Sequence, residues 1–207
     1  MIHITEPTEI EKRSFEIITE GLKGREFDPR CENVIKRVIH TTADFDYADN
    51  LFFSGGAVEA AGSALKSGAR IVTDTKMAMA GINKKALAQF GCELYCFIDA
   101  PDVIETAKAK GITRAKAAVD KAAESLISPV IFVVGNAPTA LIRLHELITA
   151  GTITPALVIA VPVGFVNVVE SKELILNLKV PHIVAKGQKG GSNVAAAICN
   201  ALLYDIM

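Results

Sequence analysis

The stretch VIFVVGNAPTALIRLHELITAGTITPALVIAVPVGF (130–165) decides the fold class of this chain. It contains two continuous apolar runs, VIFVV and ALVIAV, with an apolar helical segment between them. Strands that are apolar on both faces are typical of parallel sheets covered by helices, whereas half-exposed antiparallel strands alternate polar and apolar residues. The stretch therefore predicts a strand–helix–strand unit of a parallel sheet.

The same alternation continues on both sides of this stretch. Strands are expected at 71–73, 93–98, 130–134, 156–161 and 182–185, with helices between them. We predict one α/β domain over residues 1–207, with three α/β/α layers and a doubly wound, mainly parallel sheet of about five strands. Residues 1–40 should form a helical segment that packs on this α/β core. Its first helix spans 9–22, with Thr8 as N-cap and the apolar residues on one face.

Each predicted strand runs into a polar or glycine-rich turn: TDTK, DAPD, GNAPT, PVGF and KGQKGGSN. In open parallel sheets the ligand crevice lies beyond the carboxyl ends of the strands. Each turn also leads into a helix N-terminus, whose free N–H groups attract anions. The crevice should therefore suit a ligand that carries several carboxylates or phosphates.

Composition narrows the functional classes. Half of the 207 residues are apolar and 22% are charged, which supports a sizeable core and leaves apolar surface for a subunit interface. The net charge of −1 gives no basic footprint for nucleic acid. No apolar run reaches the ~18 residues that span a bilayer, and the N-terminus is not that of a signal peptide. We expect a cytoplasmic protein without nucleic-acid or membrane partners.

The four cysteines form no CxxC pair and are expected to be buried free thiols, as in a reducing compartment: Cys31, Cys92, Cys96 and Cys199.

Nucleotide and nucleophile motifs are absent. There is no GxxxxGK[ST], no GxGxxG after the first strand and no GxSxG. The glycine cluster of KGQKGGSN has two open interpretations, a phosphate cradle or a tight turn into the C-terminal helix. The histidines do not have metal-ligand spacing, so no protein-bound metal is expected.

His40 differs from the other three histidines. His145 lies in an apolar helix and His182 in a strand, where structural roles are expected, and His3 is close to the terminus. His40 ends a helix and enters the TTADFD loop. A helix C-terminus favours the imidazolium and burial against a ligand disfavours it, so its charge could be poised near neutrality. An acid/base catalyst and a helix-capping histidine are the alternatives.

Six blocks of sequence resemble the precorrin-8X methylmutase family. They are RVIHTTADFD (37–46), TDTKMAMAGINK (73–84), GITRAKAAVD (111–120), GNAPTALIRL (135–144), VPVGFVNVVESKE (161–173) and KGGSNVAAAICNALL (189–203). Their order and length make chance agreement implausible. The first two are most similar to the branch that acts on the cobalt-containing intermediate.

The resemblance implies an isomerase of cobalamin biosynthesis. In this family a methyl group migrates from ring carbon 11 to ring carbon 12, which converts cobalt-precorrin-8 or precorrin-8X to cobyrinate or hydrogenobyrinate. The reaction is formally a [1,5]-sigmatropic shift, so no dissociable cofactor is implied, and any cobalt belongs to the substrate. One imidazole that supplies and recovers a proton, in a pocket fitted to the rearranged isomer, would accelerate it.

The resemblance also assigns residues. The family's acid/base histidine falls on His40, a position lining the macrocycle on Ser14, and a ligand-facing arginine on Arg114, whose guanidinium can grip a carboxylate. Further substrate-binding residues are expected in the same motifs: Thr41, Asn83, Asn136, Thr139, Lys189 and Ser192. Gln188 stands where the family often has Arg, which leaves one carboxylate contact in doubt. An apolar slot for the ring is expected at Met77, Met79, Phe165 and Val166.

A homodimer with sites near the interface is also implied, because the macrocycle is large for one domain of this size. Two alternatives remain: a corrinoid or tetrapyrrole carrier without catalysis, and a nucleotide-binding α/β module. Turnover of the substrate separates the first from an enzyme, and stabilisation by NAD or ATP would favour the second.

Overall fold

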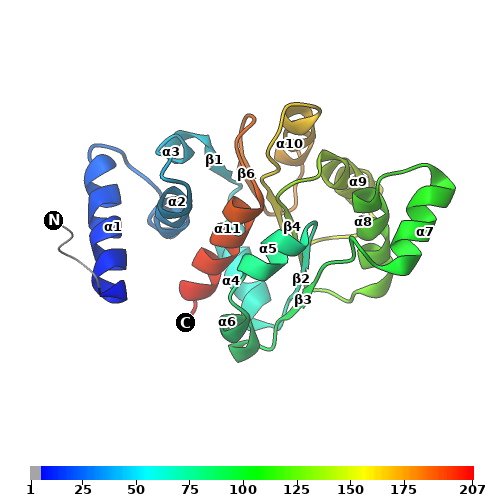
Figure 1. The fold of residues 1–207 in the computed structure, drawn as a ribbon, viewed down its shortest axis with the longest axis horizontal. Coiled ribbons are helices and arrows are strands. Elements are labelled where there is room, and N and C mark those ends of the chain that lie inside the picture. The colour runs from blue at the N-terminus through cyan, green and yellow to red at the C-terminus, as the bar shows by residue number, and fades with distance from the viewer. Residues whose placement is uncertain (1–5) are drawn as a thin grey trace.

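A six-stranded sheet forms the centre of the structure, a computed structural model that describes residues 6–207 (Figure 1). Its strands are β1 (Leu51–Phe53), β2 (Arg70–Thr73), β3 (Glu93–Tyr95), β4 (Val130–Val134), β5 (Leu157–Ala160) and β6 (His182–Ala185). They are ordered β1-β6-β5-β4-β2-β3, and every neighbouring pair is parallel except β1 and β6. The prediction of a doubly wound, mainly parallel sheet is confirmed. His3 lies outside the described residues.

The strand that the sequence interpretation missed is β1. It has only three residues, LFF, and pairs antiparallel with β6 at the edge of the sheet, with Leu51 opposite Ala185. A three-residue run is too short to show a period, and the apolar stretches of the buried strands dominated the pattern. The sheet therefore has one more strand than the five whose positions were predicted.

Helices cover both faces of the sheet. One apolar core joins α2 (Pro29–Thr42), α4 (Ala57–Lys66), α5 (Lys76–Gly81), α6 (Lys84–Gln89) and α11 (Ser192–Tyr204) to one face. The other joins α8 (Arg114–Ser125), α9 (Pro138–Thr149) and α10 (Val168–Leu176) to the opposite face, with α7 (Pro101–Lys110) outside α8. Successive residues of β4 point to alternate layers: Ile131 belongs to the first core and Phe132 to the second. The three-layer prediction is thus confirmed.

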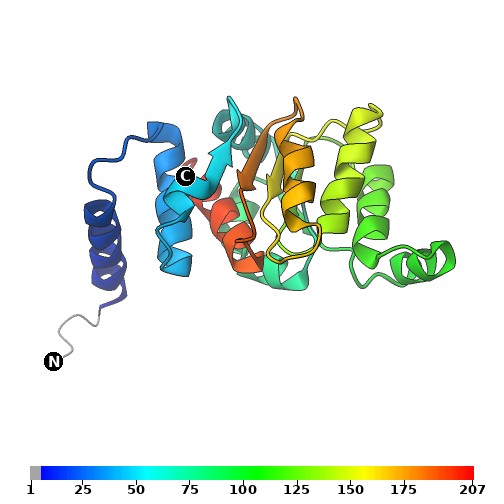
Figure 2. The ribbon, with the colours of Figure 1, turned by 90° about the horizontal axis from the view of Figure 1, so that it is seen from above.

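The N-terminal helices differ in how they pack. The helix α2 buries Val34, Ile35, Val38 and Ile39 and lies along α11. The helix α1 (Pro7–Gly21) lies beyond α2, at one end of the molecule (Figure 2), and only Ile18 within it is buried. Its predicted apolar face is divided: Ile18 and, just after the helix, Leu22 are buried, whereas Ile10 is 46% and Ile17 51% exposed.

The first two helices begin in different ways. Thr8 is not the N-cap of α1: the helix starts at Pro7 after Glu6, since proline suits the first helical position. Asp28 does cap α2, accepting a hydrogen bond from the Arg30 N–H.

The cysteines are free, as predicted; Cys96 and Cys199 are buried, whereas Cys31 and Cys92 are half-buried. Within residues 6–207, no helix has both the length and the apolar character needed to cross a membrane.

Candidate active site

The carboxyl ends of β2 and β4 mark the topological switch point of the sheet. The chain leaves β2 towards α5 on one face and leaves β4 towards α9 on the other. In doubly wound sheets the ligand crevice opens where neighbouring connections diverge in this way. The turns TDTK and GNAPT meet here, as the sequence pattern predicted.

Residues 186–192, which we call the crossing segment, run from the end of β6 across the ends of β5 and β4. A Cβ atom at Gly190 would lie 2.1 Å from the carbonyl oxygen of Val161, which follows β5. A Cβ atom at Gly135, after β4, would lie 2.8 Å from the Cα of Ser192. Only glycine permits backbone approaches of this kind. This close packing explains Gly190 and Gly135 without invoking a phosphate cradle.

Ser192 starts α11 at the far end of the crossing segment and is half-buried. Its hydroxyl lies 2.8 Å from the hydroxyl of Thr75, which also caps α5 by accepting from the Ala78 N–H. The predicted binding residue Ser192 is therefore at the switch point, with its hydroxyl already hydrogen-bonded to another turn.

Asp74 organises the turn beside it, and the sequence interpretation did not assign it a role. Its buried carboxylate accepts from the backbone N–H groups of Gly135, Asn136 and Ala137 at 2.9, 2.8 and 2.7 Å. Burial raises the pKa of Asp74, while the three N–H donors favour its ionised form. The backbone of the GNAPT turn is thus fixed, and the Asn136 side chain is left exposed. The only sequence signal was an acidic residue directly after a buried strand.

Lys172 on α10 holds the beginning of the crossing segment. Its side chain is buried, and the ammonium Nζ donates to the carbonyl oxygens of Gly187 at 2.7 Å and Lys189 at 2.8 Å. Burial lowers the pKa of this lysine to about 8. This role of Lys172 was not predicted from the sequence, because helical periodicity does not reveal which charged side chain is buried.

Lys189 connects the crossing segment to the loop that follows His40. Its Nζ lies 2.6 Å from a carboxylate oxygen of Asp44 and 2.6 Å from one of Asp46. The Lys189 ammonium lowers the pKa of Asp44. The predicted substrate contact of Lys189 would thus compete with two carboxylates of this chain.

His40 ends α2 as predicted, and its side chain is exposed. The imidazole stacks on Phe15 of α1, with ring centroids 5.2 Å apart. Its ring nitrogens have no hydrogen bond to any residue in the described range 6–207, and the helix is capped instead by the Ala43 N–H on the Ile39 carbonyl. This leaves the imidazole available to a ligand and does not favour the capping interpretation.

Two predicted substrate-binding residues are sequence neighbours of the stacked rings: Thr41 follows His40, and Ser14 precedes Phe15. Thr41 is exposed, and its hydroxyl donates to the Arg37 carbonyl at 3.0 Å. Ser14 is half-buried, and its hydroxyl donates to the Ile10 carbonyl at 2.8 Å. A groove of about 830 Å³ between α1 and α2 reaches Phe15 and Arg37.

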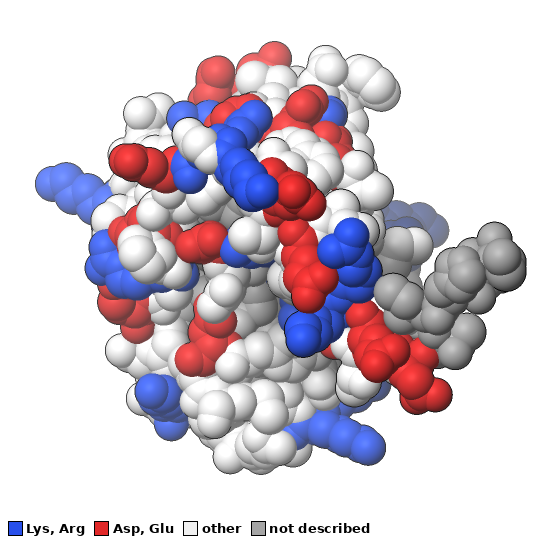
Figure 3. Space-filling model, turned by 90° about the vertical axis from the view of Figure 1, so that its left-hand side faces the viewer, with Lys and Arg blue, Asp and Glu red and all other residues white. Residues whose placement is uncertain are grey.

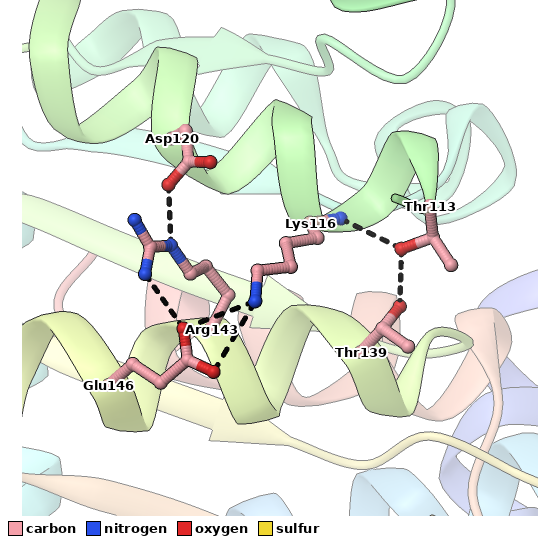
Figure 4. Close-up of polar contacts among 6 residues, drawn as sticks. All are labelled: Thr113, Lys116, Asp120, Thr139, Arg143 and Glu146. Carbon is pink, nitrogen blue, oxygen red and sulfur yellow. Dashed lines mark hydrogen bonds and ion pairs between the residues drawn. The ribbon is translucent and has the colours of Figure 1, made fainter. Parts of the chain in front are cut away.

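Arg114 and Thr139 start two adjacent helices, α8 and α9. Figure 4 shows the contacts that lock these helices together: the hydroxyls of Thr113 and Thr139 lie 2.8 Å apart, and Arg143 bridges Asp120 and Glu146. The Thr139 hydroxyl is thus occupied by Thr113. Arg114 is exposed, and its guanidinium has no ion pair with a carboxylate of residues 6–207.

The structure does not bring Asn83 to the switch point. Its amide oxygen caps α6, accepting from Lys85 and Ala86, and its amide nitrogen donates to the Tyr204 hydroxyl. Tyr204 ends α11 and Ser192 starts it, which separates them by about 18 Å at 1.5 Å per residue. A helix-capping role accounts for Asn83 within one chain.

Apolar side chains project from the turns beyond β2 and β5. Phe165 is 85%, Val166 77% and Met77 72% exposed, while Met79 is half-buried. Large exposed apolar side chains around a crevice are typical of a binding surface. The predicted apolar slot therefore combines two exposed loop residues, Phe165 and Val166, with two residues of α5, of which Met77 is exposed and Met79 half-buried.

The two histidines that were expected to be structural lie elsewhere. His182 is buried in β6 and stacks on Phe52, and burial lowers its pKa. His145 is half-buried on α9. Within residues 6–207, no three histidine, cysteine or acidic side chains cluster closely enough to hold a metal ion.

Comparisons of the sequence and of the fold with known proteins point to one family. The family model described as precorrin-8X methylmutase matches residues 9–205. A cobalt-precorrin-8 methylmutase of Salmonella typhimurium is 49% identical, over 100% of this chain and 99% of its own length. One of Leptospira interrogans is 45% identical, over 94% and 91%. The crystal structure of a precorrin-8X methylmutase from Thermus thermophilus superposes with a TM-score of 0.88 at 43% identity, over 95% of each chain. The chain belongs to the precorrin-8X methylmutase family.

Proposed function

We propose that the protein catalyses the migration of a methyl group from ring carbon 11 to ring carbon 12 of cobalt-precorrin-8, giving cobyrinate in cobalamin biosynthesis. The observation that carries this proposal is the 49% identity, over the full chain, to a protein named cobalt-precorrin-8 methylmutase. The next two relatives, 45% and 42% identical, have the same name, which favours the cobalt-containing substrate over the metal-free one.

His40 is the proposed proton donor and acceptor. Its imidazole is exposed and lies at the C-terminus of α2, where the helix dipole favours the imidazolium. A proton given to the macrocycle would bias its conjugated system towards migration, and the neutral imidazole would take the proton back afterwards. The methyl group stays on the substrate and the proton returns, so the reaction is balanced without a redox partner or a dissociable cofactor. Cobalt, where present, belongs to the substrate.

Arg114 is the proposed anchor for a substrate carboxylate. Its side chain is exposed and forms no direct ion pair within residues 6–207, although its charge helps to lower the pKa of Asp99. The N-termini of α8, α9 and α11 add free N–H groups for further carboxylates. Asn136, Ser192 and Lys189 would contribute polar contacts, and Phe165, Val166 and Met77 would contact the ring. Ser14 and Thr41 would line the part of the site nearest His40.

A homodimer is the proposed assembly. The helix α1 leaves Ile10 and Ile17 half exposed and buries little against its own chain. A second copy could cover this surface and enclose a macrocycle that one domain leaves open. The cytoplasm is the proposed location, and four free thiols suit a reducing compartment.

The experiment is to mix the purified protein with cobalt-precorrin-8 and to follow the visible spectrum of the macrocycle. We expect conversion to cobyrinate. Binding of cobyrinate without conversion would favour the carrier alternative. A rise in melting temperature with NAD or ATP, but not with cobyrinate, would favour the nucleotide-binding module.

A further inference from the structure

We propose that Lys172 is a positioning residue: its buried ammonium group holds the crossing segment in place so that this segment can take part in substrate binding. The inference rests on the proposed function, because the ligand is the corrinoid substrate. Lys172 does not touch the crevice itself and would act through residues 186–192.

The burial of Lys172 is the first observation. Its side chain is 1% exposed, which places it among the largest fully buried side chains of the described chain. Within residues 6–207 its ammonium has no ion pair with a carboxylate. Burying a charge without a counter-charge is unfavourable, and an apolar residue of similar volume usually serves stability as well or better. Stability therefore does not explain a charged residue at this position, whereas the backbone carbonyls that its ammonium holds do.

The hydrogen bonds of the ammonium are the second observation. The same Nζ donates to the carbonyls of Gly187 and Lys189, two residues apart on the segment. The residue between them, Gln188, has an exposed side chain, and its carbonyl accepts from the Gly164 N–H at 3.1 Å. The backbone is thus pinned from both sides around Gln188, the position where this chain departs from the family pattern.

The third observation is what lies beyond the pinned residues. Lys189 reaches Asp44 and Asp46 in the loop after His40, and Ser192 reaches Thr75 at the switch point. Between them, the Gly191 N–H donates to the Val161 carbonyl at 2.8 Å. If the ammonium were lost, the segment would keep the bond from the Lys186 N–H to the Asn50 carbonyl but lose the bonds at Gly187 and Lys189, and the side chains of Lys189 and Ser192 would be placed less well.

The variant Lys172→Met tests this role, because methionine retains an apolar side chain of similar size and has no N–H donor. We expect a folded protein in which the Gly191 amide hydrogen, which donates to the Val161 carbonyl, exchanges at least tenfold faster, while those of β5 keep wild-type rates. The KM for cobalt-precorrin-8 should rise about tenfold, which corresponds to ~1.4 kcal/mol, with a smaller change in kcat. The Kd for cobyrinate should rise with it.

Ser171→Ala is the matched control. Ser171 is equally buried on α10, but its hydroxyl donates to the Val168 carbonyl of the same helix. This variant should leave the exchange of the Gly191 amide hydrogen and the KM unchanged, whatever it does to the melting temperature.

A wild-type exchange rate at Gly191 in folded Lys172→Met would overturn the inference, and so would a loosened segment with an unchanged KM. If Lys172→Met does not fold, Lys172→Gln is measured instead, since its amide can still donate to a carbonyl. Intermediate exchange rates and an intermediate KM are then expected, and wild-type values of either would overturn the inference. Wild-type protein that binds cobyrinate but never converts cobalt-precorrin-8 would reject the proposed function; the exchange rates and the Kd for cobyrinate would still decide the role of Lys172.

Discussion

The crossing segment and the helix α1 both carry residues proposed to bind substrate, yet the chain holds them very differently. The crossing segment lies against strand ends, and buried Lys172 donates to two of its carbonyls. The helix α1 buries one residue, Ile18, and contacts α2 through an exposed Phe15–His40 stack and an ion pair between Arg37 and Glu11. If the proposed site is right, one chain preorganises the side that would bind substrate carboxylates, and a ligand or a second copy would complete the side of His40.

The face around α1 in Figure 3 carries acidic and basic side chains interspersed, rather than one charged patch. Ion pairs such as Arg13–Glu16 and Lys23–Glu20 lie on this helix. Exposed pairs of this kind contribute little to stability. The side of His40 is therefore held weakly by electrostatics as well as by packing.

The largest expected effect is on the rate of the reaction, which should depend on His40, whereas binding of cobyrinate should depend mainly on the crossing segment and the helix N-termini. His40→Ala should lower the rate of methyl migration by about 10²–10⁴-fold, because a general acid/base is lost, while cobyrinate still binds. The rate is measured from the visible spectrum and the fold from circular dichroism. Turnover near the wild-type rate in a folded variant would remove His40 from the mechanism, without affecting the family assignment.

Asp74 tests how firmly the switch point is held. Asp74→Ala would leave three N–H groups of the GNAPT turn without their acceptor, and we expect the free energy of unfolding to fall by about 3 kcal/mol. Asp74→Asn keeps one amide oxygen as acceptor and should lose less. Urea unfolding measures both. Equal stability of Asp74→Ala and wild type would mean that the turn is held by packing alone.

Arg114→Ala should weaken cobyrinate binding by about 1.5–3 kcal/mol, the range for a hydrogen bond to a charged group. His145→Asn serves as the control, since His145 lies on α9 away from the strand ends. Titration calorimetry compares the two. A larger loss for His145→Asn would show that the crevice has been misplaced.

The smallest effect on stability is expected on α1. Ile17→Glu replaces a residue that is 51% exposed. The free energy of unfolding of the monomer should therefore change by no more than about 0.5 kcal/mol, with a correspondingly small change in melting temperature. If a second copy covers this surface, the same variant should shift sedimentation from dimer to monomer. Wild-type protein that is monomeric and fully active at micromolar concentration would contradict the dimer.

The sequence predicted the sheet and its layers, because continuous apolar runs are local signals. Strand-end turns, which are local signals too, predicted the edge of the sheet for the candidate site, and this stays a prediction. Sequence-based prediction failed where the outcome depends on distant partners. Whether Ile10 and Ile17 are covered depends on how α1 packs, which helical periodicity does not determine. The roles of Asp74 and Lys172 depend on backbone atoms 61 and 15 residues away in the sequence. Asn83 was assigned to the crevice by its motif, and its capping bonds became visible only with the position of α6.

The two strands at the borders of the sheet, β1 and β3, have three residues each. A border strand this short offers few free N–H and C=O groups to an incoming strand from another molecule. The protein should therefore resist aggregation through strand addition, even at high concentration or when it is newly synthesised. Association between copies is then expected to use helices and loops rather than the borders of the sheet.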